Sequence, residues 1–176
     1  MPEGDTLHRA AARVGAALLG MRLVAVEGSH RAVARDGRRL AGRTVTGVEA
    51  IGKHLLIHTD AAWSVRTHLG MTGRWVVLAP DAPWRTSPGK ARLVLRTAEA
   101  VAVCFAAPTV EIAPTPQIAA TVERLGPDLI VDAPPFDEIV SRARASASPT
   151  VADLLLDQQV ASGIGNVYKS EVLFLE

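Results

Sequence analysis

The first residues of the chain could perform amine chemistry. If Met1 is removed, Pro2 carries a free secondary α-amine, whose reference pKa of about 7.7–8.0 leaves part of it neutral at physiological pH. Such an amine can attack a carbon centre and form an iminium, and Glu3 beside it could transfer the protons. By position alone, the alternative is a loose start before a helix capped by Asp5 or Thr6.

A second candidate is the stretch LLLDQQVASGIGNVYKSEVLF near the end of the sequence. Gly163 and Gly165 permit positive φ and a close approach of the backbone. The helix that follows presents free N–H groups suited to a phosphate oxygen, and the Asn166 amide could add a donor. The alternative is a plain turn between helices, with Asn166 as an N-cap.

The elements that must position these residues follow from periodicity. A helix is predicted over residues 5–19, ended by Gly20. Short strands follow over residues 22–28, 43–52, 53–59, 63–69, 73–79, 91–97 and 100–106. Helices are predicted over 115–126, 136–145, 148–159 and from 167 onwards, with Ser148 as a cap and Pro149 in the first turn.

This pattern predicts an α+β fold. Residues 1–113 should form an N-terminal helix and an antiparallel β-sandwich or barrel, the catalytic β-domain. Residues 114–134 should form a helix and a linker, and residues 135–176 an incomplete helical domain. Strands at this spacing favour a sandwich or barrel over βαβ units.

Composition and charge set limits on function. The chain is 48% hydrophobic, and no apolar run approaches the roughly 20 residues that span a bilayer. Cys104, the only cysteine, excludes an intramolecular disulfide and favours a cytoplasmic location. His54 and His58 would lie about 13 Å apart on a strand, too far for one metal ion.

Positive charge is concentrated among residues 1–45. It marks either a surface for a polyanion or a solvated face. The arginines in this part of the chain are Arg9, Arg13, Arg22, Arg31, Arg35, Arg38, Arg39 and Arg43.

Four segments, in order, resemble the formamidopyrimidine-DNA glycosylase / endonuclease VIII family. They are MPEG at the amino terminus, AIGKHLLI around Lys53, THLGMTGRW around His68 and Met71, and the glycine–asparagine stretch that ends in Asn166. The last resembles the family's helix–two-turn–helix DNA-binding motif. The opening MPEGDT is most similar to actinobacterial endonuclease VIII.

The resemblance implies a role for each of these residues. Pro2 would be the nucleophile and Glu3 the proton shuttle, while Lys53 would contact phosphate and the reacting sugar. His68 and Asn166 would hold backbone phosphate, and Met71 would fill the space left by an extruded nucleotide. The alternatives are a strand-edge lysine for Lys53, a satisfied half-buried histidine for His68 and a core methionine for Met71.

The resemblance also implies a function. We expect a monomeric, bacterial, nucleoid-associated DNA glycosylase and abasic-site lyase for base-excision repair. Its partner would be double-stranded DNA with oxidised bases, mainly pyrimidines, or abasic sites. No cofactor and no metal are expected in this chain, although relatives carry a zinc or zincless finger further on.

The sequence departs from the family at three points, of which the Thr6 change argues only against the details of the oxidised-purine branch, while the missing Arg–Phe pair and the early end favour another function. Thr6 replaces a glutamate found in many relatives, an expected Arg–Phe pair is missing near VCFAAPTVEI, and the chain stops inside the second helix of the motif. A non-catalytic module that binds damaged DNA is therefore the main alternative. A β-barrel that binds a small ligand is the other, supported only by the strand pattern.

Overall fold

A computed structural model describes residues 2–83 and 87–175 of the chain. Helix α1 (Gly4–Leu18) comes first and buries one face, made of Leu7, Ala10, Ala11, Val14 and Leu18. Neither Asp5 nor Thr6 caps it, contrary to the prediction. The Asp5 carboxylate instead accepts a hydrogen bond from Arg9 at 2.6 Å, and the backbone carbonyl of Glu3 accepts from the N–H groups of Thr6 and Leu7.

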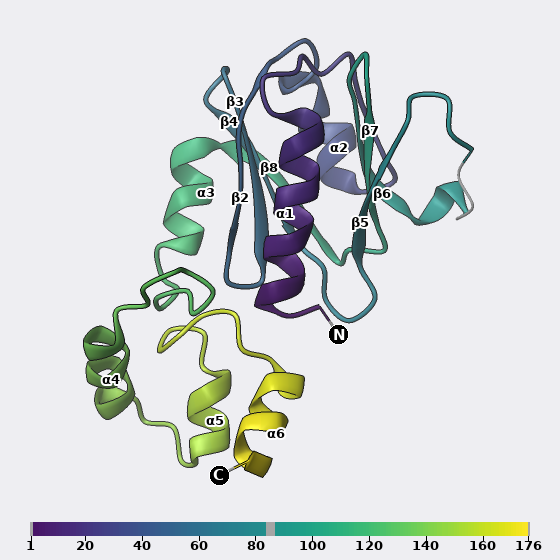
Figure 1. The fold of residues 1–176 in the computed structure, drawn as a ribbon. Coiled ribbons are helices and arrows are strands. Elements are labelled where there is room, and N and C mark those ends of the chain that lie inside the picture. Colours follow the sequence, from purple (N-terminus) through teal and green to yellow (C-terminus); the bar gives the residue numbers. More distant parts are fainter. Residues whose placement is uncertain (1, 84–86, 176) are drawn as a thin grey trace.

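Two antiparallel four-stranded sheets form the β-domain, which confirms the predicted α+β fold. One sheet has the order β1 (Ala25–Glu27), β6 (Ala91–Arg96), β7 (Val101–Phe105) and β5 (Arg74–Leu78). The other has the order β2 (Val45–Ile51), β3 (His54–Thr59), β4 (Trp63–His68) and β8 (Thr109–Pro114). Their facing side chains share one core with α1, which packs along both sheets (Figure 1).

The structure adds elements that the sequence pattern did not predict. They are helix α2 (Arg31–Asp36), the short 3₁₀ turns η1 (Gly37–Arg39) and η2 (Pro88–Lys90), and strand β8. Helix α2 buries only Ala32 and Val33, and two apolar residues are too few to show a helical period. Strand β1 is shorter than predicted, and Arg22 forms only an isolated bridge with Thr44.

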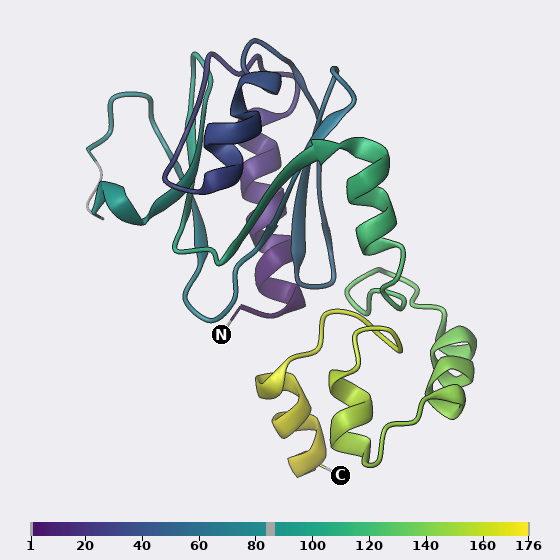
Figure 2. The ribbon, with the colours of Figure 1, turned by 180° about the vertical axis from the view of Figure 1, so that it is seen from behind.

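The helices after β8 form two groups. Helix α3 (Thr115–Val122) packs on the second sheet, where Ile118 and Val122 join Leu56 and Ala113 in a small core. Helices α4 (Phe136–Ala145), α5 (Val151–Leu156) and α6 (Asn166–Leu175) gather beyond one end of the sheets (Figure 2).

The start of α5 differs from the prediction. Thr150, not Ser148, is the N-cap, and its Oγ1 accepts a hydrogen bond from the Asp153 N–H at 3.1 Å. Ser148 lies too far from the first turn, and its hydroxyl pairs with that of Ser146 at 2.8 Å. Among the described residues, no helix has both the length and the apolar character needed to cross a bilayer.

Candidate active site

Three glycines bring distant parts of the chain into contact. The N–H of Gly4 donates to the carbonyl of Gly163 at 2.9 Å. A Cβ on Gly163 would lie 3.6 Å from the Gly4 Cα and 4.0 Å from the Gly52 Cα, and one on Gly52 would lie 2.8 Å from the Ser162 Cβ. The amino terminus, the β2–β3 turn and the joint before α6 therefore meet at one point. Glu3 and Lys53 are the direct neighbours of two of these glycines.

Glu3 is buried in this junction, with 2% of its surface exposed. Its Oε1 accepts a hydrogen bond from the Val167 N–H at 2.8 Å. Its Oε2 accepts from the Gly165 N–H at 2.9 Å and the Tyr168 N–H at 3.2 Å. Glu3 thereby binds the positive end of α6 from the far end of the sequence, a role that no local pattern predicted.

These bonds correct one expectation about the joint. The N–H groups at the start of α6 were expected to be free for a phosphate oxygen, but those of Gly165, Val167 and Tyr168 already bind Glu3. Asn166 itself is exposed at the first position of the helix. Its side chain forms no hydrogen bond with any residue that the structure describes, so its amide can donate to a ligand.

Lys53 lies close enough to Glu3 for the carboxylate to influence its pKa. Burial lowers the pKa of the Lys53 ammonium, and the negative charge of Glu3 opposes that change by raising it. Pro2 is half-buried directly before Glu3. Met1 lies outside the described residues, so the free amine of Pro2 stays a prediction.

Asp128, in the linker after α3, is a site residue that the sequence reasoning missed. Its Oδ2 accepts a hydrogen bond from the Gly52 N–H at 2.7 Å and lies 2.8 Å from the His8 Nε2. Its Oδ1 accepts from the Ile130 N–H at 3.0 Å. One carboxylate thus fixes α1, the turn that carries Lys53 and the linker. The Gly–Pro–Asp sequence marks a turn, but nothing local reveals the long-range partners.

His68 lies at the end of β4 with its tautomer fixed by the backbone. Its Nδ1 accepts a hydrogen bond from the Gly70 N–H at 3.2 Å, so the neutral ring carries its proton on Nε2 and can donate there. Burial lowers the pKa of His68, and the charges of Lys53 and Arg66 lower it further. His68 is therefore a neutral donor at physiological pH.

His54 lies opposite His68 in the β3–β4 register, with the ring centroids 5.1 Å apart. Burial is the main cause that lowers the pKa of His54 to about 4, and the charges of Arg66, His68 and Lys53 add to it. Arg66 donates to the His54 Nδ1 at 3.2 Å and to a Glu111 carboxylate oxygen at 2.9 Å. This chain of polar groups holds the strand on which His68 lies.

Met71 lies at the tip of the β4–β5 turn with 75% of its surface exposed. Gly70 adopts a φ of 59°, and the Gly73 N–H closes the turn on the Leu69 carbonyl at 2.9 Å. The core-methionine alternative is wrong for Met71, because its side chain has little protein around it. The structure therefore presents an unbranched apolar side chain on a short, hydrogen-bonded turn.

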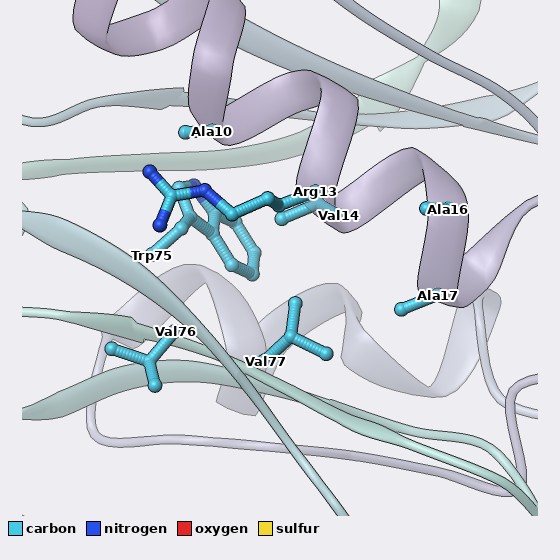
Figure 3. Close-up of a pocket in the computed structure, with 8 residues that line it drawn as sticks. All are labelled: Ala10, Arg13, Val14, Ala16, Ala17, Trp75, Val76 and Val77. Carbon is cyan, nitrogen blue, oxygen red and sulfur yellow. The ribbon is translucent and has the colours of Figure 1, made fainter.

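A separate hollow of about 470 Å³ contains none of these residues. It lies between α1 and β5, and Figure 3 shows the Arg13 side chain beside the ring of Trp75 over a floor of Val76 and Val77. Within the described ranges, no group of three His, Cys, Asp or Glu side chains could hold a metal ion.

Comparison with known proteins places the chain in a family. The sequence profile of the formamidopyrimidine-DNA glycosylase N-terminal domain matches residues 1–109. Probable endonuclease 8 2 of Streptomyces coelicolor is 39% identical over 178 residues, which cover 99% of this chain and 63% of that protein. DNA-(apurinic or apyrimidinic site) lyase Nei2 of Mycolicibacterium smegmatis is 34% identical over 99% of this chain and 67% of its own length.

A solved structure shows the same fold. The crystal structure of Lactococcus lactis formamidopyrimidine-DNA glycosylase, bound non-covalently to DNA with an abasic site, matches 98% of this chain and 68% of its own with a TM-score of 0.82 at 22% identity. This chain spans 63% of the Streptomyces relative's length. The profile, the relatives and the fold agree that this chain belongs to the formamidopyrimidine-DNA glycosylase / endonuclease VIII family.

Proposed function

We propose that this protein is a DNA glycosylase with abasic-site lyase activity that removes oxidised bases, mainly pyrimidines, through its amino-terminal proline. The observation that carries the proposal is the junction of the amino terminus, the Lys53 turn and the start of α6. There Glu3 is bound by three backbone N–H groups. It lies beside the Lys53 ammonium, whose pKa is lowered by burial, an effect that the Glu3 charge opposes. Pro2 is the adjoining residue.

The first step of the proposed reaction replaces a bond to the base by a bond to the protein. The Pro2 nitrogen attacks C1′ of the damaged nucleoside, and the glycosidic bond breaks with its electron pair leaving on the base. The departing base takes up a proton and the attacking nitrogen gives up its own, which restores the lone pair on nitrogen. The C1′–O4′ bond then opens, O4′ takes up a proton, and an iminium remains between Pro2 and C1′. A secondary amine can form this iminium but cannot lose a further proton to become a neutral imine.

The second step cuts the DNA strand. The iminium acidifies the C2′ protons, so loss of one proton expels the 3′ phosphate by β-elimination. Loss of the C4′ proton then expels the 5′ phosphate by δ-elimination. Water hydrolyses the remaining iminium and restores the Pro2 amine.

Glu3 and Lys53 support these steps in the proposal. The three backbone hydrogen bonds use three of about four lone-pair sites on the Glu3 carboxylate, which leaves one to accept or deliver a proton. Positioned acid–base groups of this kind contribute about 10²–10⁴-fold in rate. The Lys53 ammonium binds the phosphate next to the lesion as a compact charge with rotatable donors.

Double-stranded DNA is the proposed partner. His68 donates to a backbone phosphate from Nε2, the exposed Asn166 amide contacts a second one, and Met71 enters the stack when the damaged nucleotide is extruded. Two observations support this assignment: the donors are free of other partners among the described residues, and Met71 lies on an exposed turn.

Borohydride trapping on duplex DNA with an oxidised pyrimidine or an abasic site tests the proposal. We expect a covalent adduct with the unmodified protein, none with Pro2→Gly, and an undiminished adduct with Lys169→Ala. A non-catalytic damage-binding module gives a different result, because the protein would then bind the lesion but yield neither an adduct nor strand scission.

A further inference from the structure

A positively charged surface lies at the opposite end of the second sheet from the candidate active site. Lys53 precedes strand β3, and the β3–β4 turn with Ala61 follows it. The strand has six residues, so its two ends are about 20 Å apart at ~3.4 Å per residue. The length of this strand therefore separates the surface from Lys53.

The surface is a hollow of about 340 Å³. We call it the basic hollow, and its lining residues are Arg38, Arg39, Arg43, Ala61 and Trp63. A fourth arginine is close by, because a Cβ on Gly42 would lie 3.5 Å from an Arg22 guanidinium nitrogen. All four arginines are exposed.

The arginines of the basic hollow, Arg38, Arg39 and Arg43, form no ion pair with any residue that the structure describes. Clustered like charges repel one another and attract an anion to the hollow.

Trp63 organises one of these arginines. The guanidinium carbon of Arg39 lies 5.3 Å from the centroid of the Trp63 ring, a cation–π distance. Trp63 packs against the hydrophobic core of the β-domain, so it supplies a fixed platform. Arg39 is therefore held with its fork of N–H donors available, and this fork matches the geometry of phosphate oxygens.

We propose that Arg38, Arg39 and Arg43 bind the phosphate backbone of a second DNA segment, away from the active site. The lining of the hollow has exposed cations and no buried polar side chain that would enclose a small anion. Such a surface fits repeated phosphates on a chain. The inference goes beyond the proposed reaction, since this surface makes no contact with Glu3 or Lys53.

The test measures binding of an undamaged fluorescent duplex to protein whose active-site contacts have been removed. Lys53→Ala, His68→Ala and Asn166→Ala, combined, provide that background. Adding Arg38→Ala, Arg39→Ala and Arg43→Ala should weaken the remaining binding at least about tenfold at about 50 mM salt and reduce the slope of log K against log salt by roughly 2–3. The matched control replaces Arg13, Arg124 and Arg144 by alanine, which changes the net charge equally, and should change the affinity far less.

Two outcomes would overturn the proposal. An equal loss in the control would show that only net charge matters. The second outcome is that inorganic pyrophosphate changes the Trp63 fluorescence, a signal that Trp63→Phe removes, while the duplex does not bind. That result would show a site for small phosphate anions instead.

Strand incision of a short lesion duplex by protein altered only at the three hollow arginines is a separate readout. We expect it to be unchanged, and its absence in the unmodified protein would contradict the proposed reaction but not this surface.

Discussion

The carboxylate of Glu3 occupies the place that a side chain on residue 165 would need. The Gly165 N–H donates to the Glu3 Oε2 at 2.9 Å, and a Cβ on Gly165 would lie 2.5 Å from the Glu3 Cδ. That distance is far below a van der Waals contact, so only glycine allows Glu3 to reach the start of α6. The contact between Glu3 and Gly165 therefore positions both the proposed acid–base group and the start of α6.

Replacing Gly165 by alanine should displace Glu3 and disable the enzyme without unfolding it. We expect strand incision at an abasic site to fall about 10²-fold, the scale of one positioned acid–base group, and stability to fall by about 1–3 kcal/mol through overpacking. Single-turnover incision and urea unfolding measure the two effects. Gly89→Ala is the matched control, because a Cβ there would meet nothing nearer than the Ser87 Oγ at 3.9 Å. Wild-type incision by Gly165→Ala would contradict the assignment of Glu3.

The low pKa of His54 should make the protein less stable in mild acid. Its pKa is about 4 in the fold and about 6.5 in an unfolded chain, so the unfolded state binds more protons between these values. The contribution of His54 to the free energy of unfolding is therefore fully present above about pH 6.5. It is lost as the pH drops towards 4, which lowers the free energy of unfolding by up to about 3 kcal/mol. Urea unfolding across this range should show the slope in wild type and a smaller one in His54→Gln. The control is His58→Gln, which removes an imidazole from the same strand and should keep the part of the pH dependence that comes from His54. A pH dependence in His54→Gln as steep as that of wild type would refute the prediction.

Lys53 and His68 should differ in how salt affects their contribution to DNA binding. A Lys53→Ala variant loses a cation at a phosphate, so the slope of log K against log salt should fall by about 0.9. A His68→Ala variant loses a neutral donor, so affinity should fall about tenfold with the slope unchanged at about pH 7.5. Fluorescence anisotropy at several salt concentrations measures both. Equal slope changes in the two variants would show that His68 binds as a cation.

Met71→Ala should impair base removal more than cleavage at a preformed abasic site. Because 75% of Met71 is exposed, its truncation should change stability by less than about 0.5 kcal/mol. Extruding a paired nucleotide costs a few kcal/mol, so loss of the side chain that fills the stack should slow excision of an oxidised pyrimidine about tenfold. Leu19→Ala removes an exposed apolar side chain from the end of α1 and serves as the control. Equal effects on both substrates would argue against a wedge.

Periodicity predicted much of the fold. The alternating strands, α1 and α4 were recognisable because each has a repeating apolar face or clear boundaries. Helix α2 and strand β8 were missed, because α2 buries only two residues and β8 follows a tight turn with Ala106 at a φ of 52°. The caps of α1 and α5 were misplaced within the first turn, since several neighbouring polar residues could serve equally well in the sequence.

The sequence predicted which residues belong to the candidate site, but it did not predict the contacts that arrange them. Motif resemblance identified Glu3, Lys53 and Asn166, and the structure brings their segments together. Resemblance did not reveal that Glu3 binds the start of α6, or that Asp128 holds the Lys53 turn, because these contacts join residues 162 and 76 positions apart. Long-range hydrogen bonds leave no local pattern in a sequence.

The most direct test of the account is to locate the trapped sugar on the protein. After borohydride reduction with abasic-site DNA, digestion and mass spectrometry should find the sugar remnant on an amino-terminal peptide that begins at Pro2. This result requires both that Met1 has been removed and that Pro2 is the nucleophile. A remnant on Lys53 or Lys169, or an amino-terminal peptide that retains Met1 in active protein, would contradict the central claim.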